Sequence, residues 1–246
     1  MNIHTFGDKS NKTVVLIHGA LCPWQMWDEA IEYFKNDYYV VVPELDGHTE
    51  DKTSRFTSVE EEAAEISRYL KENLDGKIYT LCGLSMGGRV AATVAKDKNL
   101  SIEKLVLDGA PLKKIPGILV GIMKKSYKNI IHKAKARDPK VLESFKRDFL
   151  PERYLEEFLK IADNMEDASI DNMLESVFGE FKFIKYNSDM NILFMHGTKG
   201  NEAVSAKGAV LMKKYNPQTE IRSFNGYAHA QLACFEQSKW IKEVLS

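Results

Sequence analysis

The chain has 246 residues, a formal net charge of −1 at neutral pH and a hydrophobic content of 44%. This composition is ordinary for a soluble globular protein, and the length fits one domain with a sizeable insertion. The balanced charge gives no reason to expect nucleic acid as a partner. The longest apolar stretch, Ile115 to Met123, is too short to span a bilayer, so we expect no stable membrane insertion.

Strands and helices alternate in the first part of the chain. Apolar or β-branched runs predict buried strands at 13–17, 38–42, 78–82 and 102–107. The segments 23–36, 57–73 and 89–96 between these runs predict helices. This alternation predicts an α/β fold with a mostly parallel sheet and helices on both faces.

The alternation stops after residue 111 and resumes near residue 188. Residues 112–187 contain only helical patterns, interrupted by Pro116, Pro139 and Pro151, whereas 191–197 and 220–224 again read as strands. Helices are expected at 203–215 and at the end of the chain. We therefore predict a core formed by 1–111 and 188–246 with an inserted helical cap, 112–187, over the carboxyl edge of the sheet, where open α/β sheets place their sites.

The predicted cap has an uneven charge distribution. Lysine and arginine dominate residues 113–147, whereas aspartate and glutamate dominate residues 148–180. One interpretation is that two solvated helix faces pair with each other. The other is a basic lid that steers an anionic substrate or touches an acidic membrane surface.

The segment Gly83-Leu84-Ser85-Met86-Gly87 follows a predicted strand and precedes a predicted helix. In this context the pattern indicates a nucleophile elbow, in which a strained turn exposes the serine hydroxyl at the top of the sheet. Flanking glycines let neighbouring backbone come close, and the helix N-terminus favours developing negative charge. Ser85 is therefore the candidate nucleophile.

Ser85 is followed by candidate acids and then by His229, and His18-Gly19 follows the first strong strand. With these motifs the chain resembles the α/β-hydrolase superfamily over about residues 12–111 and 188–246, and it looks closest to small, cap-bearing, cofactor-free esterases. The resemblance implies an acyl-enzyme on Ser85, with His229 as general base and the backbone N–H groups of Ala20 and Met86 as oxyanion hole.

The triad acid departs from the superfamily pattern. Members commonly place an aspartate where this chain has Gly200. Glu202, two residues further on, is one candidate, and Asp108, at the end of the strand after the nucleophile helix, is the other. A triad without a conventional acid is a third alternative.

The remaining expectations concern ligands and location. Leu21, Trp24 and His48 are candidates for the substrate pocket, although the same residues can be core. The histidine spacing predicts no metal site, and no nucleotide-binding motif is found, so the expected partner is a small-molecule substrate without a cofactor. Cys22, Cys82 and Cys234 have no disulfide spacing, and no signal peptide precedes them, which favours a cytoplasmic protein.

These features predict a serine hydrolase that cleaves a small ester, in the manner of a carboxylesterase. Two alternatives stay open. One is a lyase or carbon–carbon bond hydrolase of the same fold, and the other is a slow or non-catalytic small-ligand-binding protein.

Overall fold

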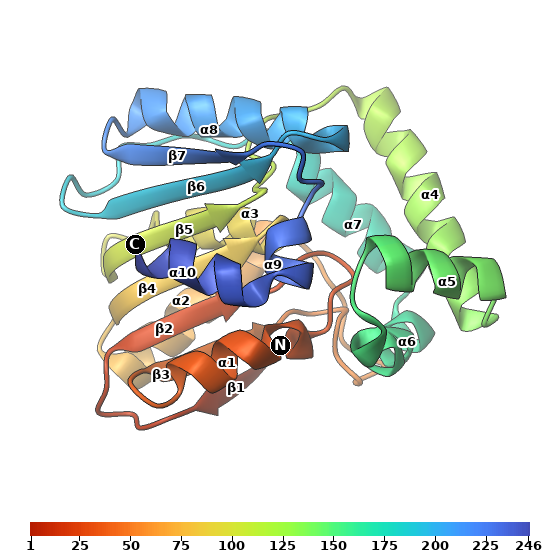
Figure 1. Cartoon of the computed structure of the whole chain (residues 1–246), viewed down its shortest axis with the longest axis horizontal. Helices are drawn as coiled ribbons and strands as arrows, with labels where there is room; N and C mark the ends of the chain where they lie inside the picture. The colour runs from red at the N-terminus through yellow and green to blue at the C-terminus, as the bar shows by residue number, and fades with distance from the viewer.

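A seven-stranded sheet runs through the molecule (Figure 1). The computed structural model describes the chain from Met1 to Ser246, except for the side chain of Asn201. The strand order is β1-β3-β2-β4-β5-β6-β7, and only β1 is antiparallel to its neighbour. The strands are β1 (Asn2–Phe6), β2 (Thr13–Ile17), β3 (Tyr39–Glu44), β4 (Lys77–Leu84), β5 (Ser101–Asp108), β6 (Asn191–Gly197) and β7 (Thr219–Phe224).

Helices lie on both faces of this sheet. In Figure 1, α1 and α10 lie in front of the sheet, and α2 and α3 lie behind it. The helices of this core are α1 (Asp28–Phe34), α2 (Val59–Leu74), α3 (Met86–Val94), α8 (Ala203–Tyr215), α9 (Gln231–Phe235) and α10 (Gln237–Leu245). The predicted α/β fold with a mostly parallel sheet is thus confirmed.

The central strands are buried because both of their faces are covered. Every residue of β2 and of β3 is buried, which explains why their sequences are continuous apolar runs instead of alternating patterns. The edge strand β1 was not predicted. Its sequence, Asn2-Ile3-His4-Thr5-Phe6, is largely polar, and two of the five residues are exposed. It forms a strand because it pairs with β3 at the edge of the sheet.

Only helices lie between β5 and β6. They are α4 (Gly117–Lys135), α5 (Pro139–Asp148), α6 (Leu155–Asn164) and α7 (Asp167–Phe178), with a short 3-10 turn at Glu152–Tyr154. Figure 1 places these helices beyond the carboxyl ends of the strands. They therefore stand on the side of the sheet where the elbow at the end of β4 opens. No helix among the described residues is long and apolar enough to cross a membrane.

Oppositely charged helices pair within this segment. Lys128 Nζ lies 2.7 Å from a carboxylate oxygen of Asp171, and His132 Nε2 lies 2.8 Å from one of Asp167. Lys124 also contacts Glu175. The basic α4 thus packs beside the acidic α7, which supports the first of the two interpretations of the charge pattern for these residues.

Two predicted helices are each divided. Residues 24–27 form a 3-10 turn, Trp24–Trp27, before α1 begins. The last predicted helix is split into α9 and α10 at Glu236, whose φ of −130° and ψ of 48° are not helical. Sequence periodicity alone does not reveal such breaks, since both halves continue the apolar pattern.

Candidate active site

Ser85 occupies the sharp turn between β4 and α3. Its φ of 52° and ψ of −115° lie in a strained region for a residue with a side chain. The turn is held to the next strand, since the Ser85 N–H donates to the Asp108 carbonyl oxygen at 2.7 Å. Glycine is required on both sides because a Cβ at Gly83 would overlap the Gly87 carbonyl, and a Cβ at Gly87 would overlap the carbonyl of Ile17. The tight turn thereby presents the Ser85 hydroxyl at the carboxyl edge of the sheet.

His229 faces Ser85 from the loop between β7 and α9. Its Nε2 lies 2.8 Å from Ser85 Oγ. The loop is fixed by neighbouring backbone, because the N–H groups of Thr198 and Lys199 both donate to the Tyr227 carbonyl oxygen at 3.0 Å. The segment after β6 and the histidine loop are therefore bound together, which sets the position of the imidazole.

Glu202 contacts the other ring nitrogen of His229. It ends the 3-10 turn Gly200–Glu202, in which Gly200 has a φ of 67°, and its side chain is buried. Oε1 contacts His229 Nδ1, whereas Oε2 accepts from the Gly197 N–H at 3.0 Å. Both carboxylate oxygens thus have a partner, and the carboxylate is fixed against the imidazole.

Asp108 lies nearby but is not paired with His229. It ends β5, is 5% exposed, and its Oδ2 has no hydrogen-bond partner among the described residues. Burial raises the pKa of Asp108 to about 7; the neighbouring His229 and the indole N–H of Trp240 oppose this shift, and the negative charge of Glu202 adds to it. Of the two candidate acids, the structure places Glu202 in contact with the histidine.

The loop after β2 lies beside the elbow. A Cβ on Gly19 would stand 3.6 Å from the Cβ of Ser85. Leu21 has a φ of 60°, and the Cys22 N–H donates back to the Gly19 carbonyl at 3.2 Å. This tight turn carries Ala20, the residue whose N–H the sequence offers as an oxyanion donor.

Two buried histidines brace this turn. His48 Nε2 accepts from the Leu21 N–H at 3.0 Å, and His18 Nε2 accepts from the Leu45 N–H at 3.1 Å. Burial lowers the pKa of His18 to about 3 and that of His48 to about 4, so both rings are neutral at pH 7 and can act as acceptors. The structure therefore gives His48 a bracing contact, where the sequence suggested a place in the substrate pocket.

An apolar cavity of about 240 Å³ begins at Leu21. Its other walls come from α4, α5 and α6, chiefly Tyr127, Ile130, Val141, Phe145, Phe149 and Phe158. Trp24, which the sequence also suggested for a pocket, lies elsewhere. The 3-10 turn directs it towards β1, where it stacks on His4 with ring centroids 4.1 Å apart. Sequence analysis missed these residues of the segment between β5 and β6 because no motif marks them.

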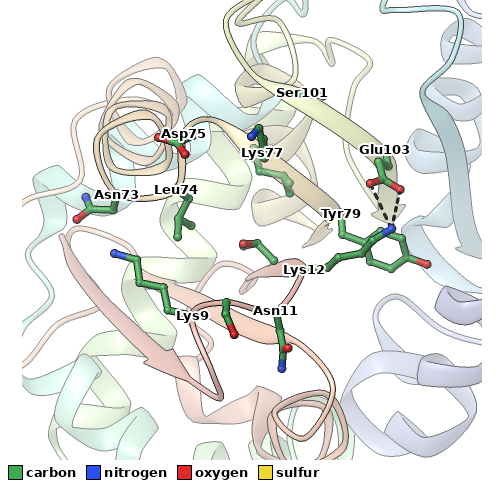
Figure 2. A pocket seen from close by; sticks show the side chains of 13 residues that line it. Lys9, Asn11, Lys12, Asn73, Leu74, Asp75, Lys77, Tyr79, Ser101 and Glu103 are labelled. Atoms are coloured by element: carbon green, nitrogen blue, oxygen red, sulfur yellow. Dashed lines mark hydrogen bonds and ion pairs between the residues drawn. The ribbon is translucent and has the colours of Figure 1, made fainter.

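A different hollow, of about 620 Å³, lies at the amino ends of β2, β4 and β5, and Figure 2 shows the side chains that line it. The amino ends of these parallel strands lie opposite the edge that carries Ser85. Lys12 spans part of this hollow, with Nζ 3.5 Å from a carboxylate oxygen of Glu103 and 4.4 Å from the Tyr79 ring centre. This hollow is therefore separate from the turn that carries Ser85.

The described residues contain no group of three histidine, cysteine, aspartate or glutamate side chains arranged to hold a metal ion. The three cysteines are free and buried. Burial raises the pKa of the Cys22 thiol to about 12, so it is not a thiolate at neutral pH.

A strained serine between strand and helix, facing a histidine that contacts a buried glutamate, on a mostly parallel sheet, defines the α/β-hydrolase class of proteins. A family model described as the alpha/beta hydrolase fold matches residues 12–233. The chain therefore belongs to the α/β-hydrolase family, as its motifs led us to expect. A search of curated proteins finds no match.

Solved structures with this fold resemble the chain over nearly its full length. An alpha/beta hydrolase family protein from Desulfitobacterium hafniense is 24% identical, with 100% of both chains covered and a TM-score of 0.79. MenH from S. aureus is 18% identical, covering 99% of this chain and 97% of that one, with a TM-score of 0.71. A carboxylesterase from Nitrososphaera gargenis is 18% identical, covering 99% and 92%, with a TM-score of 0.73. At these identities the likeness concerns the fold.

Proposed function

We propose that the protein is a serine hydrolase that cleaves carboxylic esters through an acyl-enzyme on Ser85. The observation that carries this proposal is the line of contacts from Ser85 Oγ to His229 Nε2, at 2.8 Å, and from His229 Nδ1 to Glu202. The carboxylesterase among the structural neighbours agrees with this chemistry.

In the first half-reaction Ser85 Oγ attacks the acyl carbon while His229 Nε2 takes its proton. Glu202 accepts from Nδ1–H, which keeps Nε2 free as the base and stabilises the imidazolium. The N–H groups of Ala20 and Met86 have no hydrogen-bond partner in the described part of the chain. They are free to bind the oxyanion, each contributing about 3 kcal/mol to the lowering of the barrier.

The first half-reaction ends with release of the alcohol, which returns His229 to its neutral state. His229 gives its proton to the departing alcohol oxygen as the carbon–oxygen bond breaks, which leaves the acyl group on Ser85. In the second half-reaction, water loses a proton to His229 while its oxygen attacks the acyl carbon. Collapse of this intermediate releases the carboxylic acid and returns the proton to Ser85.

The apolar cavity bordered by Leu21 supports an apolar acyl or alcohol group in the substrate. Leu21 belongs to the same tight turn as Ala20, so a substrate group bound in the cavity would lie next to the proposed oxyanion donor. A volume of about 240 Å³ with mostly aliphatic and aromatic walls fits a short chain or a single ring.

Labelling with a fluorophosphonate, followed by intact-mass analysis, tests this proposal. Wild type should gain one adduct that Ser85→Ala lacks, and Glu202→Gln should label about 10⁴-fold more slowly, as for loss of a triad acid. Asp108→Asn, the matched carboxamide variant, should label at the wild-type rate. An unlabelled wild type would overturn the proposal and favour the ligand-binding alternative.

A burst of alcohol release from a p-nitrophenyl ester, equal to the enzyme concentration, distinguishes ester hydrolysis from the lyase alternative. A lyase or carbon–carbon bond hydrolase of this fold that forms no acyl-enzyme would give no such burst. The contact between Glu202 and His229 counts against the non-catalytic alternative, which was motivated by the uncertain acid.

A further inference from the structure

Three large apolar side chains are exposed on the first two turns of α4. Ile118 is 82% exposed, Ile122 is 61% exposed and Leu119 is 49% exposed. Ile118 and Ile122 are four residues apart, so they lie on the same side of the helix, with Leu119 beside them. Exposed aliphatic side chains that lie beside one another, unlike single ones, are a feature of protein or membrane interaction sites.

This side of α4 faces away from the rest of the protein. The buried residues Ile131 and Ala134 and the half-buried Tyr127 lie on the opposite side of the helix. Lys125 is exposed one turn beyond Ile122 and two turns beyond Ile118, on their side of the helix. Figure 1 shows α4 at the margin of the molecule, where a large flat partner can reach it.

The basic residues of α4 and of the segment just before it form two groups, one paired with acids of α7 and one without ion pairs. Lys124, Lys128 and His132 pair with acids of α7. Four exposed lysines have no recorded ion pair among the described residues; they are Lys113, Lys114, Lys125 and Lys133. No acidic residue occurs between Leu112 and Arg137, so nothing on this segment neutralises them.

We propose that the outer face of α4, formed by Ile118, Leu119, Ile122 and Lys125, together with Lys113 and Lys114 just before the helix, binds the surface of an anionic lipid bilayer. Aliphatic side chains enter the boundary between headgroups and acyl chains, while the lysines pair with anionic headgroups. A second copy of the chain suits this face poorly, because two identical basic faces repel each other. The protein would lie on the membrane without crossing it, with the cap facing the lipid.

This proposal is independent of the chemistry at Ser85, since the face lies outside the candidate active site. Its test is sedimentation of the full chain with vesicles of phosphatidylcholine alone and with vesicles of equal parts phosphatidylcholine and phosphatidylglycerol. Wild type should bind the second kind, and binding should weaken as salt is added, because surface charge is screened. Hydrolysis of a water-soluble ester, measured in parallel, reports separately on the active site.

Helix α8 supplies matched controls, since it also exposes an aliphatic residue and three lysines. Ile118→Ser with Ile122→Ser should lower vesicle binding at least tenfold, since two apolar side chains no longer enter the lipid. Exposed Val210, changed to Ser, should have no effect.

The triple change Lys113→Gln, Lys114→Gln and Lys125→Gln should lower binding by about fivefold per lysine. The same change at exposed Lys207, Lys213 and Lys214 of α8 should lower it much less. Equal losses from both helices, equal binding to both kinds of vesicle, or no binding by wild type would overturn the proposal. A dimer in light scattering that the isoleucine variant dissociates would also overturn it, and would assign the face to a second copy.

Discussion

The buried carboxyl group of Asp108 is expected to destabilise the folded protein at neutral pH. Its Oδ2 is buried without a hydrogen-bond partner in the described chain, and burial raises its pKa to about 7. A carboxyl group with a raised folded-state pKa binds more protons in the folded state than in the unfolded state. Folding stability therefore falls as pH rises from the ordinary value of 3.8 to about 7, and the loss is complete above that value.

The expected gain from Asp108→Asn follows from this shift. A difference of about 3 pKa units corresponds to about 4 kcal/mol at pH 8, since each unit is about 1.4 kcal/mol. The amide of asparagine has two donors in place of one, and an unpaired buried donor costs about 1–3 kcal/mol. We expect a net gain in the free energy of unfolding of about 1–3 kcal/mol at pH 8 and no gain at about pH 3, where the wild-type carboxyl group is largely protonated in both states.

Guanidinium unfolding of wild type and Asp108→Asn at both pH values measures this difference. Asp189→Asn, at an exposed aspartate, is the control for loss of a charge and should change stability by less than about 0.5 kcal/mol at either pH. A variant that is less stable than wild type at pH 8, or a difference that does not depend on pH, would refute the reasoning. Ser85 labelling at the wild-type rate in the same variant would separate this effect from any catalytic role.

Three further predictions concern the elbow, the oxyanion loop and the thiols. Gly83→Ala should destabilise the fold by about 3 kcal/mol or more in thermal unfolding, because its Cβ would overlap the Gly87 carbonyl. His48→Ala removes the acceptor of the Leu21 N–H and should lower kcat about tenfold or more in an ester assay, with little change in KM. The native protein should not react with a thiol reagent until guanidinium unfolds it, because Cys22, Cys82 and Cys234 are buried; fast native labelling would contradict this.

The fold was predictable from the sequence where an apolar run coincides with a strand that is buried on both faces. The runs at 13–17 and 191–197 are strands with those bounds in the structure, because strands covered on both faces need continuous apolar sequence. The elbow was predictable for a different reason, since its glycines are demanded by close backbone contacts within the turn itself. The edge strand β1 was not, because its conformation depends on pairing with β3 and not on its own residues.

The pocket was less predictable, because its walls depend on how distant helices pack. Leu21 borders the apolar cavity, whereas Trp24, three residues later, begins a 3-10 turn and stacks on His4 of β1. The aromatic residues of α5 and α6 that complete the cavity follow an ordinary amphipathic pattern. Nothing in that pattern distinguishes a helix face that borders a cavity from one that packs in a core.

The choice between Glu202 and Asp108 as triad acid could not be made from the sequence alone. Strands β5 and β6 are neighbours, with Asp108 beside Met195, so the ends of both strands open near the same histidine. Proximity in the fold therefore leaves both acids as candidates, and the turn after β6 decides between them. The 3-10 turn at Gly200–Glu202 brings the longer glutamate side chain back to His229, while Asp108 is left buried without a partner for Oδ2 among the described residues. A carboxylate fixed by two contacts suits the orientation of an imidazole, whereas a carboxyl group with a pKa near 7 is partly protonated at working pH and suits it less well.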